Sequence, residues 1–221
     1  MASFTALLSS TTLFLLLLVP KLSADPDQLQ DFCIADTSSP TTLMNGLPCI
    51  NPNKASANHF TSSALSMVAN TSGNPLGISV ILLTPQILPG INTLGISMAR
   101  IDMAAGGVAP PHTHPRATEI VFILRGKLIA GFVDSTNKLF SHVVKTGDVF
   151  VFPKGTLHFL QNIGGNTASI IAAFNSQNPG SFLIPFAAFA SNPAIPGPVL
   201  AKGFQISLEE VGKIRMGLGG H

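Results

Sequence analysis

Four residues in the second half of the chain have the types and spacing of a metal site. His112 and His114 are two positions apart, and residues i and i+2 of a β-strand project from the same face. Both imidazoles can therefore face one ion, which Glu119 and His158 would complete. Three imidazoles and one carboxylate form a mixed N/O donor set that suits Mn, Fe, Zn or Cu better than Ca or Mg. Four protein ligands also leave up to two octahedral positions open to a small molecule.

The alternative is that these histidines are ordinary polar residues, and an isolated His-x-His would favour that interpretation. The wider arrangement argues against it, because Pro110, Pro111 and Pro115 stiffen the chain around the pair and His158 follows the turn Pro153–Gly155. The remaining histidines lie outside this arrangement and are interpreted as surface or loop residues. They are His59, His142 and His221.

The elements that must position these side chains are predicted to be β-strands. From about residue 77 to residue 175, short runs rich in Val, Ile and Phe alternate with Gly, Pro and Asn. Many short strands at this spacing predict a barrel or jelly roll. Ser135–Asn137 is expected to form a hairpin turn. Examples of such runs are Ile78–Leu83, Thr93–Asp102, Glu119–Leu124, Lys127–Val133, Lys138–Val144, Asp148–Phe152, Leu157–Asn162 and Ala168–Asn175.

The C-terminal part has a different character. Prolines divide it into short pieces, and Ser207 and Glu210 match a capping box that starts a helix running to about Leu218. Val211, Ile214 and Leu218 fall on one face of that helix. A closed barrel leaves little core to cover, so this face is expected to pack on a neighbouring subunit.

The N-terminus has the features of a secretory signal peptide. The apolar run Leu13–Val19 is too short to span a bilayer, and small residues follow it up to Ala24. The alternative is a buried N-terminal helix. Residues 1–24 are thus expected to be removed and residues 25–221 to form one soluble domain with a core at about 60–205, because no later stretch has the length and composition of a membrane span.

Secretion favours a disulfide between the two cysteines and glycosylation at one sequon. Cys33 and Cys49 most simply form a disulfide that staples an irregular arm over residues 25–60 and adds about 3 kcal/mol. The alternative is two free or metal-binding thiols. Asn70 opens the one proline-free Asn-x-Ser/Thr sequon and is a candidate glycosylation site.

Charge and composition exclude some classes of function. The chain carries a net charge of +2, which becomes +1 once Lys21 leaves with the signal peptide, and this argues against nucleic-acid binding. Charged residues make up only 10% of the chain against 46% apolar ones, so much of the surface is expected to be hidden in an oligomer.

The glycines, prolines and ligands together form two motifs that closely resemble the two boxes of the plant germins and germin-like proteins, within the cupin superfamily. The resemblance extends over nearly all of residues 25–221, including Asp25–Cys33, Asn92–Gly95, Phe174–Gly180 and Val199–Lys202. The motif positions are Gly106, His112, His114, Glu119 and Gly126 in the first box, and Gly147, Pro153, Gly155, His158 and Asn162 in the second.

The resemblance implies a fold, a metal and an assembly. It implies a mainly β protein with a single cupin jelly-roll barrel, a disulfide-stapled N-terminal arm and short C-terminal α-helices. It further implies Mn²⁺ held by His112, His114, Glu119 and His158, a homohexamer built as a trimer of dimers, and residence in the apoplast or cell wall.

The family includes oxalate oxidases, superoxide dismutases, nucleotide pyrophosphatase/phosphodiesterases and wall, storage or receptor-like proteins without known activity, so fold and metal leave the activity open. The resemblance implies that oxalate-oxidising germins have two asparagines lining the pocket. Ala99 and Ala109 occupy those positions in this sequence. Alanine cannot donate a hydrogen bond to oxalate, which costs about 1.5–3 kcal/mol for each bond lost to a charged group.

Superoxide, a small anion, needs only an open position on a redox-active cation and a proton source. We therefore expect a manganese superoxide dismutase that produces hydrogen peroxide in the wall, with a role in defence or stress. The alternatives are a non-enzymatic wall, storage or receptor-like protein with a structural metal and, ranked below it, a phosphodiesterase. The last is disfavoured because no Lys/Arg cluster accompanies the metal motif.

Overall fold

The structure is a computed structural model that describes residues 33–38 and 46–219. The expected signal peptide, the first residues of the arm and His221 lie outside the described residues. The division into residues 1–24 and a 25–221 domain therefore stays a prediction. No helix in the described ranges is long and apolar enough to cross a membrane.

The described chain is mainly β, as expected. Its strands are β1 (Ile78–Leu82), β2 (Ser97–Met103), β3 (Val108–Thr113), β4 (Glu119–Arg125), β5 (Lys127–Val133), β6 (Leu139–Lys145), β7 (Val149–Phe152), β8 (Leu157–Asn162), β9 (Ala168–Phe174) and β10 (Phe182–Leu183). Short 3-10 helices cover η1 (Pro52–Lys54), η2 (Ala57–Phe60) and η3 (Pro89–Ile91).

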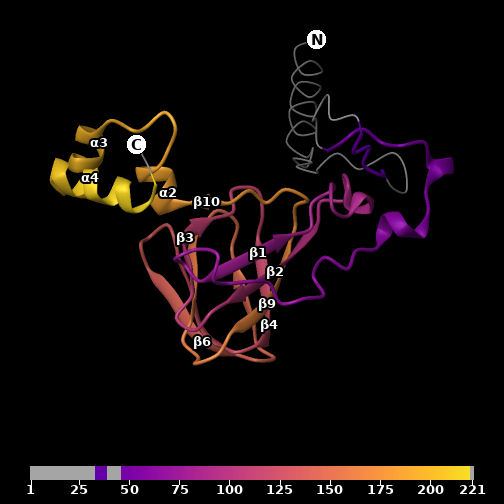
Figure 1. Ribbon diagram of the computed structural model, residues 1–221, viewed down its shortest axis with the longest axis horizontal. Helices are drawn as coiled ribbons and strands as arrows, with labels where there is room; N and C mark the ends of the chain where they lie inside the picture. Colours follow the sequence, from indigo (N-terminus) through magenta and orange to yellow (C-terminus); the bar gives the residue numbers. More distant parts are fainter. Residues whose placement is uncertain (1–32, 39–45, 220–221) are drawn as a thin grey trace, which may run out of the picture. The chain divides into compact units, whose positions relative to one another are not determined.

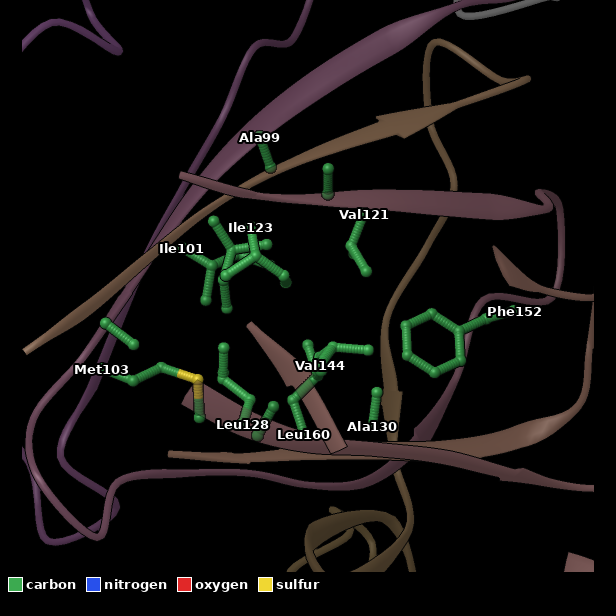
Figure 2. Packing of buried hydrophobic residues seen from close by; sticks show 14 of the residues in the cluster. Ala99, Ile101, Met103, Val121, Ile123, Leu128, Ala130, Val144, Phe152 and Leu160 are labelled. Atoms are coloured by element: carbon green, nitrogen blue, oxygen red, sulfur yellow. The ribbon is translucent and has the colours of Figure 1, made fainter. Parts of the chain in front are cut away.

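These strands form two antiparallel sheets. One has the order β1-β2-β9-β4-β7 and the other the order β10-β3-β8-β5-β6, and the two lie face to face (Figure 1). Side chains from both sheets point toward one another and fill the space between them (Figure 2). This arrangement confirms the jelly-roll expectation.

The side chains of β4 show how sequence alternation makes this core. Val121 and Ile123 are fully buried, whereas Ile120, Phe122 and Leu124 are exposed. Glu119 continues the buried series, so the strand that supplies core residues also turns a carboxylate to the interior. A one-residue shift in register would move Glu119 to the outer face.

A β-bulge in β3 places His112 on the inner face. Ala109 pairs with Leu160 and His112 pairs with His158, so three steps along β3 match two steps along β8. One extra residue is therefore present in β3. Strict alternation from the buried Ala109 would have turned His112 outward, and the bulge reverses that. Pro110 and Pro111 favour the irregularity because neither has an N–H for the ladder.

The observed elements differ from expectation in three places. The strand expected from Thr93 begins at Ser97, because Thr93 and Gly95 have positive φ values of 66° and 67° and form a turn. A strand at His112 was expected from the spacing of the two histidines, but its bounds were not, since the Pro-Pro pair of β3 obscures the alternation. Strand β10 has only two residues and gives no periodic signal.

The N-terminal arm is fixed to the barrel at its disulfide. Cys33 and Cys49 are bonded, as expected, so neither is a free thiol. Buried Asn92 accepts a hydrogen bond from the Leu47 backbone N–H at 2.9 Å. The Asn92 amide also donates to the Leu47 carbonyl at 2.7 Å and to Cys33 Sγ at 3.2 Å. One buried amide thus joins the disulfide loop to the residues that precede β2.

Three helices end the described chain: α2 (Ile184–Phe189), α3 (Gly197–Phe204) and α4 (Leu208–Gly217). The expected capping box is present in α4, with Glu210 N–H donating to Ser207 Oγ at 3.1 Å and Ser207 N–H donating to Glu210 Oε2 at 2.7 Å. Val211 is buried with Phe189 and Leu200 in a small separate core, to which the other two residues of the expected apolar face contribute. This face is therefore at least partly covered within the chain itself.

A buried ion pair ties the segment before β1 to the barrel. Asp102 is fully buried and accepts from Arg100 Nε at 2.8 Å, from Ser169 Oγ at 2.6 Å and from the Ala69 N–H at 2.9 Å. Arg100 Nη1 donates to the Leu65 carbonyl at 3.1 Å. Burial by itself raises the pKa of Asp102, but the contacts with Arg100, Ser169 and Ala69 outweigh it and lower the pKa.

Asp102→Asn should destabilise the fold by about 3–5 kcal/mol, because it leaves Arg100 buried without its counter-charge. The lowered pKa of Asp102 means that its contribution is complete above the unfolded carboxyl pKa of about 3.9 and is lost as the pH falls through the folded pKa. The difference in unfolding free energy between wild type and D102N should shrink below that pH. Denaturant unfolding of wild type and D102N at several pH values measures this difference. Glu209→Gln is the control, because the ion pair of Glu209 with Lys213 is exposed and its loss should leave the unfolding free energy nearly unaltered.

Candidate metal centre

The strand arrangement brings the four expected ligands together. His112 on β3 and His158 on β8 are direct cross-strand partners, with ring centroids 4.1 Å apart. His114 follows β3 directly, and Glu119 is the first residue of β4. One ligand atom from each residue lies within 4.8 Å of all the others, and all four residues are buried. This is the one cluster of metal-ligating residues within the described ranges.

All three imidazoles are oriented by backbone carbonyls. His112 Nδ1 lies 2.8 Å from the Pro110 oxygen, His114 Nδ1 lies 2.5 Å from the Gly180 oxygen and His158 Nδ1 lies 2.8 Å from the Thr156 oxygen. A carbonyl only accepts, so each Nδ1 must carry the proton. Each Nε2 is then left with a free lone pair, as metal coordination requires.

These lone pairs meet a carboxylate. Nε2 of His114 and Nε2 of His158 each lie 3.2 Å from Glu119 Oε2. His158 Nε2 is completely buried and has no hydrogen-bond partner. Two acceptors this close repel one another unless a positive charge lies between them. A proton can relieve one such contact, whereas a metal ion would satisfy all four donors at once, so the residues fit a metal.

The electrostatics keep most of the donors in their metal-binding forms. Burial and the nearby His158 lower the pKa of His112 to about 4, so this imidazole is neutral at physiological pH. Burial would raise the pKa of Glu119, but hydrogen bonds from the facing imidazoles and positive charge on them outweigh that and lower it to about 2, and a metal cation between these groups would act in the same direction. Burial would lower the pKa of His114, yet the adjacent Glu119 raises it, so His114 is the ligand at which a proton competes most strongly with a metal.

Aromatic rings pack against two of the ligands. Phe152 stacks on His158 with centroids 4.5 Å apart, and Phe174 meets His114 edge to face at 5.0 Å. Strand register explains both contacts, because Phe152 and Phe174 are the cross-strand partners of Glu119 on its two sides. These rings limit how far the imidazoles can rotate, and the ligand motifs gave no indication of them.

The interior next to the ligands is apolar. Ala99 pairs with Ala172, which pairs with Val121, two residues inward from Glu119. Ala109 pairs with Leu160, two residues inward from His158. Ala99 and Ala109 are both buried in the main core, and neither offers a hydrogen bond from its side chain. The two positions at which oxalate-oxidising germins are expected to carry asparagine are therefore interior positions close to the ligands.

Other residues singled out in the sequence lie elsewhere. His59 Nδ1 accepts from the Ser56 N–H at 3.0 Å, and His142 is an exposed residue of β6. Asn70 is exposed in a loop, where its Oδ1 accepts from the Ser72 N–H and hydroxyl at 2.9 and 2.7 Å.

Comparison with known proteins gives the family. The Cupin family model matches residues 65–212, and a germin-like protein 1-1 of Oryza sativa subsp. japonica is 50% identical over 201 residues, 91% of each chain. The chain belongs to the cupin family, among the germin-like proteins. Oxalate oxidase 2 of Hordeum vulgare is 47% identical over 195 residues, covering 86% of this chain and 87% of that protein. A solved structure of oxalate oxidase has a TM-score of 0.85 at 44% identity, covering 90% of this chain and all of the other. Relatives of this germin-like chain thus include an enzyme, and the donor set is that of a cupin metal site.

His158→Ala should abolish stoichiometric metal binding, because it removes the donor that is most deeply buried and has no other partner. Metal content per chain after dialysis against Mn²⁺, measured by mass spectrometry, checks this expectation. His142→Ala is the matched control, since His142 is an exposed histidine of β6 and its loss should leave metal content unchanged. Full metal content in the His158 variant would rule out this site.

Proposed function

We propose that this germin-like protein is an extracellular manganese protein that dismutates superoxide, with His112, His114, Glu119 and His158 as the metal ligands. The observation that carries the proposal is a buried cluster of three imidazoles and one carboxylate whose interior neighbours are apolar. Such a donor set suits a divalent transition metal, and neighbours without hydrogen-bond donors suit a small anion that binds through the metal alone better than a dicarboxylate.

The reaction converts two superoxide ions and two protons into dioxygen and hydrogen peroxide. Manganese held by the four ligands would supply the one-electron chemistry, because its +2 and +3 states are both accessible. The chain's own residues keep the site ready for it. Carbonyls of Pro110, Thr156 and Gly180 fix the imidazole tautomers, and Phe152 and Phe174 limit ring rotation. The ionised Glu119 would balance part of the charge of a bound metal.

Oxalate oxidation is the best alternative from the relatives, and the residues beside the ligands argue against it. Oxalate carries two carboxylates, and binding it away from water requires hydrogen-bond donors. Ala99 and Ala109 provide none, at a cost of about 1.5–3 kcal/mol for each missing bond to a charged group. Similarity of fold and metal site does not outweigh this difference, because activity depends on the residues of the site.

The proposal includes secretion and assembly as a homohexamer, a trimer of dimers. The disulfide is typical of an oxidising compartment such as the apoplast, and the exposed Asn70 sequon suits glycosylation there. The outer face of the β1-β2-β9-β4-β7 sheet supports assembly, because large exposed apolar patches mark protein interfaces. The exposed apolar residues on this face are Met98, Ile120, Phe122, Leu124, Val149 and Val151.

Purified protein should carry about one manganese per chain and should dismutate superoxide faster than the same concentration of free Mn²⁺. Metal analysis and a superoxide assay on one sample measure both quantities. The His142→Ala protein should keep the activity, and the His158→Ala protein should lose it. Fully loaded protein that is no faster than free Mn²⁺ would defeat the enzymatic proposal and favour a non-enzymatic wall or storage role.

The same loaded protein should release no hydrogen peroxide from oxalate, because the interior residues beside the ligands cannot hold the dianion. A peroxide assay run alongside a known oxalate oxidase provides the positive control. Peroxide formation that depends on oxalate and disappears in His158→Ala would overturn the argument from Ala99 and Ala109.

A further inference from the structure

The three imidazoles differ in where their carbonyl partners come from. His112 and His158 each bond a carbonyl two residues earlier in their own strand or turn. His114 instead bonds the Gly180 carbonyl, 66 residues later in the chain. The first two contacts form with the local backbone, but the third requires that the loop after β9 be held beside the loop before β4.

Arg116 holds these two loops together. Its Nε donates to the Asn178 carbonyl at 2.7 Å, and its Nη2 donates to Asn178 Oδ1 at 3.0 Å. The Arg116 backbone N–H donates to the Pro179 carbonyl at 3.2 Å. Thr118 adds a bond from its N–H to Asn175 Oδ1 at 2.7 Å. Every bond from Arg116 therefore ends on the two residues directly before Gly180.

Gly180 is closely fitted against the same arginine. Its φ of +68° is strained for any residue with a side chain. A Cβ built there would lie 2.8 Å from Arg116 Nη2 and 3.2 Å from Pro115 Cγ. The guanidinium thus lies against Asn178 and Gly180 and the Arg116 backbone binds Pro179 between them, which fixes the position from which the Gly180 carbonyl faces His114.

We propose that Arg116 is a positioning residue for the metal centre, acting through Asn178 and Gly180 on His114. Without the clamp, the Gly180 carbonyl would no longer be held beside Nδ1, and His114 would be free to exchange tautomers or rotate away from the other ligands. The partners of Arg116 are a carbonyl and an amide, so the planar guanidinium with its several fixed donors suits the task better than a lysine ammonium. The inference rests on the proposed metal site.

Arg116→Gln tests the clamp and Arg125→Gln is its matched control, because Arg125 is also an exposed arginine, at the other end of β4. The Mn²⁺ dissociation constant of R116Q should rise about 10–100-fold, as for other residues that orient a metal-bound histidine, and that of R125Q should stay as in wild type. Arg116→Lys should recover only part of the loss.

A second measurement needs no metal. The ¹⁵N shifts of His114 in metal-free protein, recorded well above the ordinary imidazole pKa of about 6.5, report which nitrogen carries the proton. Wild type and R125Q should show the proton on Nδ1, and R116Q should show a mixture. His112 and His158 should keep their Nδ1 protons in every variant, which separates the clamp from general unfolding.

The outcomes separate the two proposals. Wild-type affinity and an unchanged His114 tautomer in R116Q overturn the clamp while leaving the metal site in place. Failure of wild type to bind Mn²⁺ overturns the proposed function, and the tautomer measurement then still decides the clamp. Should R116Q fold poorly, Asn178→Ala removes one of the two side-chain contacts and should shift the tautomer and the affinity in the same direction.

Discussion

Four metal-ligand atoms crowded into a buried space are the constraint on which the rest of this structure depends. Glu119 Oε2 lies 3.2 Å from two imidazole nitrogens whose lone pairs face it, inside a barrel where water cannot screen the repulsion. The local structure around the ligands serves this arrangement. Adjacent strands β3 and β8 bring His112 and His158 together, the bulge in β3 turns His112 inward, and the alternation of β4 places Glu119 on the same face as the core.

The same fold leaves the choice of activity to a few neighbouring residues. Relatives named as oxalate oxidases share nearly half of the sequence and the whole barrel, yet the interior positions next to the ligands here are filled by side chains without hydrogen-bonding groups. Ala99 and Ala109 both belong to the apolar core that fills the space between the two sheets (Figure 2). Packing and specificity are therefore set by the same residues, and a change that adds a polar group for a substrate must also be tolerated by the core.

Much of the fold was predictable from the sequence because its signals are local. The alternation of β4, the hydrophobic runs of β5, β8 and β9, and the capping box of Ser207 and Glu210 each depend on neighbours a few residues away. Prediction failed where a local rule was interrupted. The Pro-Pro pair hid the bounds of β3, and the turn at Thr93 shortened β2 because φ is positive there.

The sequence by itself determined which residues could bind a metal and which two cysteines pair, since both follow from residue types and their spacing along the chain. Only the tertiary structure decided the orientation of His114, the rings that pack on His114 and His158, and the inward turn of His112 at the bulge. The physical reason is distance along the chain. Gly180 and Arg116 are brought together by strands β4 and β9 pairing side by side, and no spacing in the sequence records that contact.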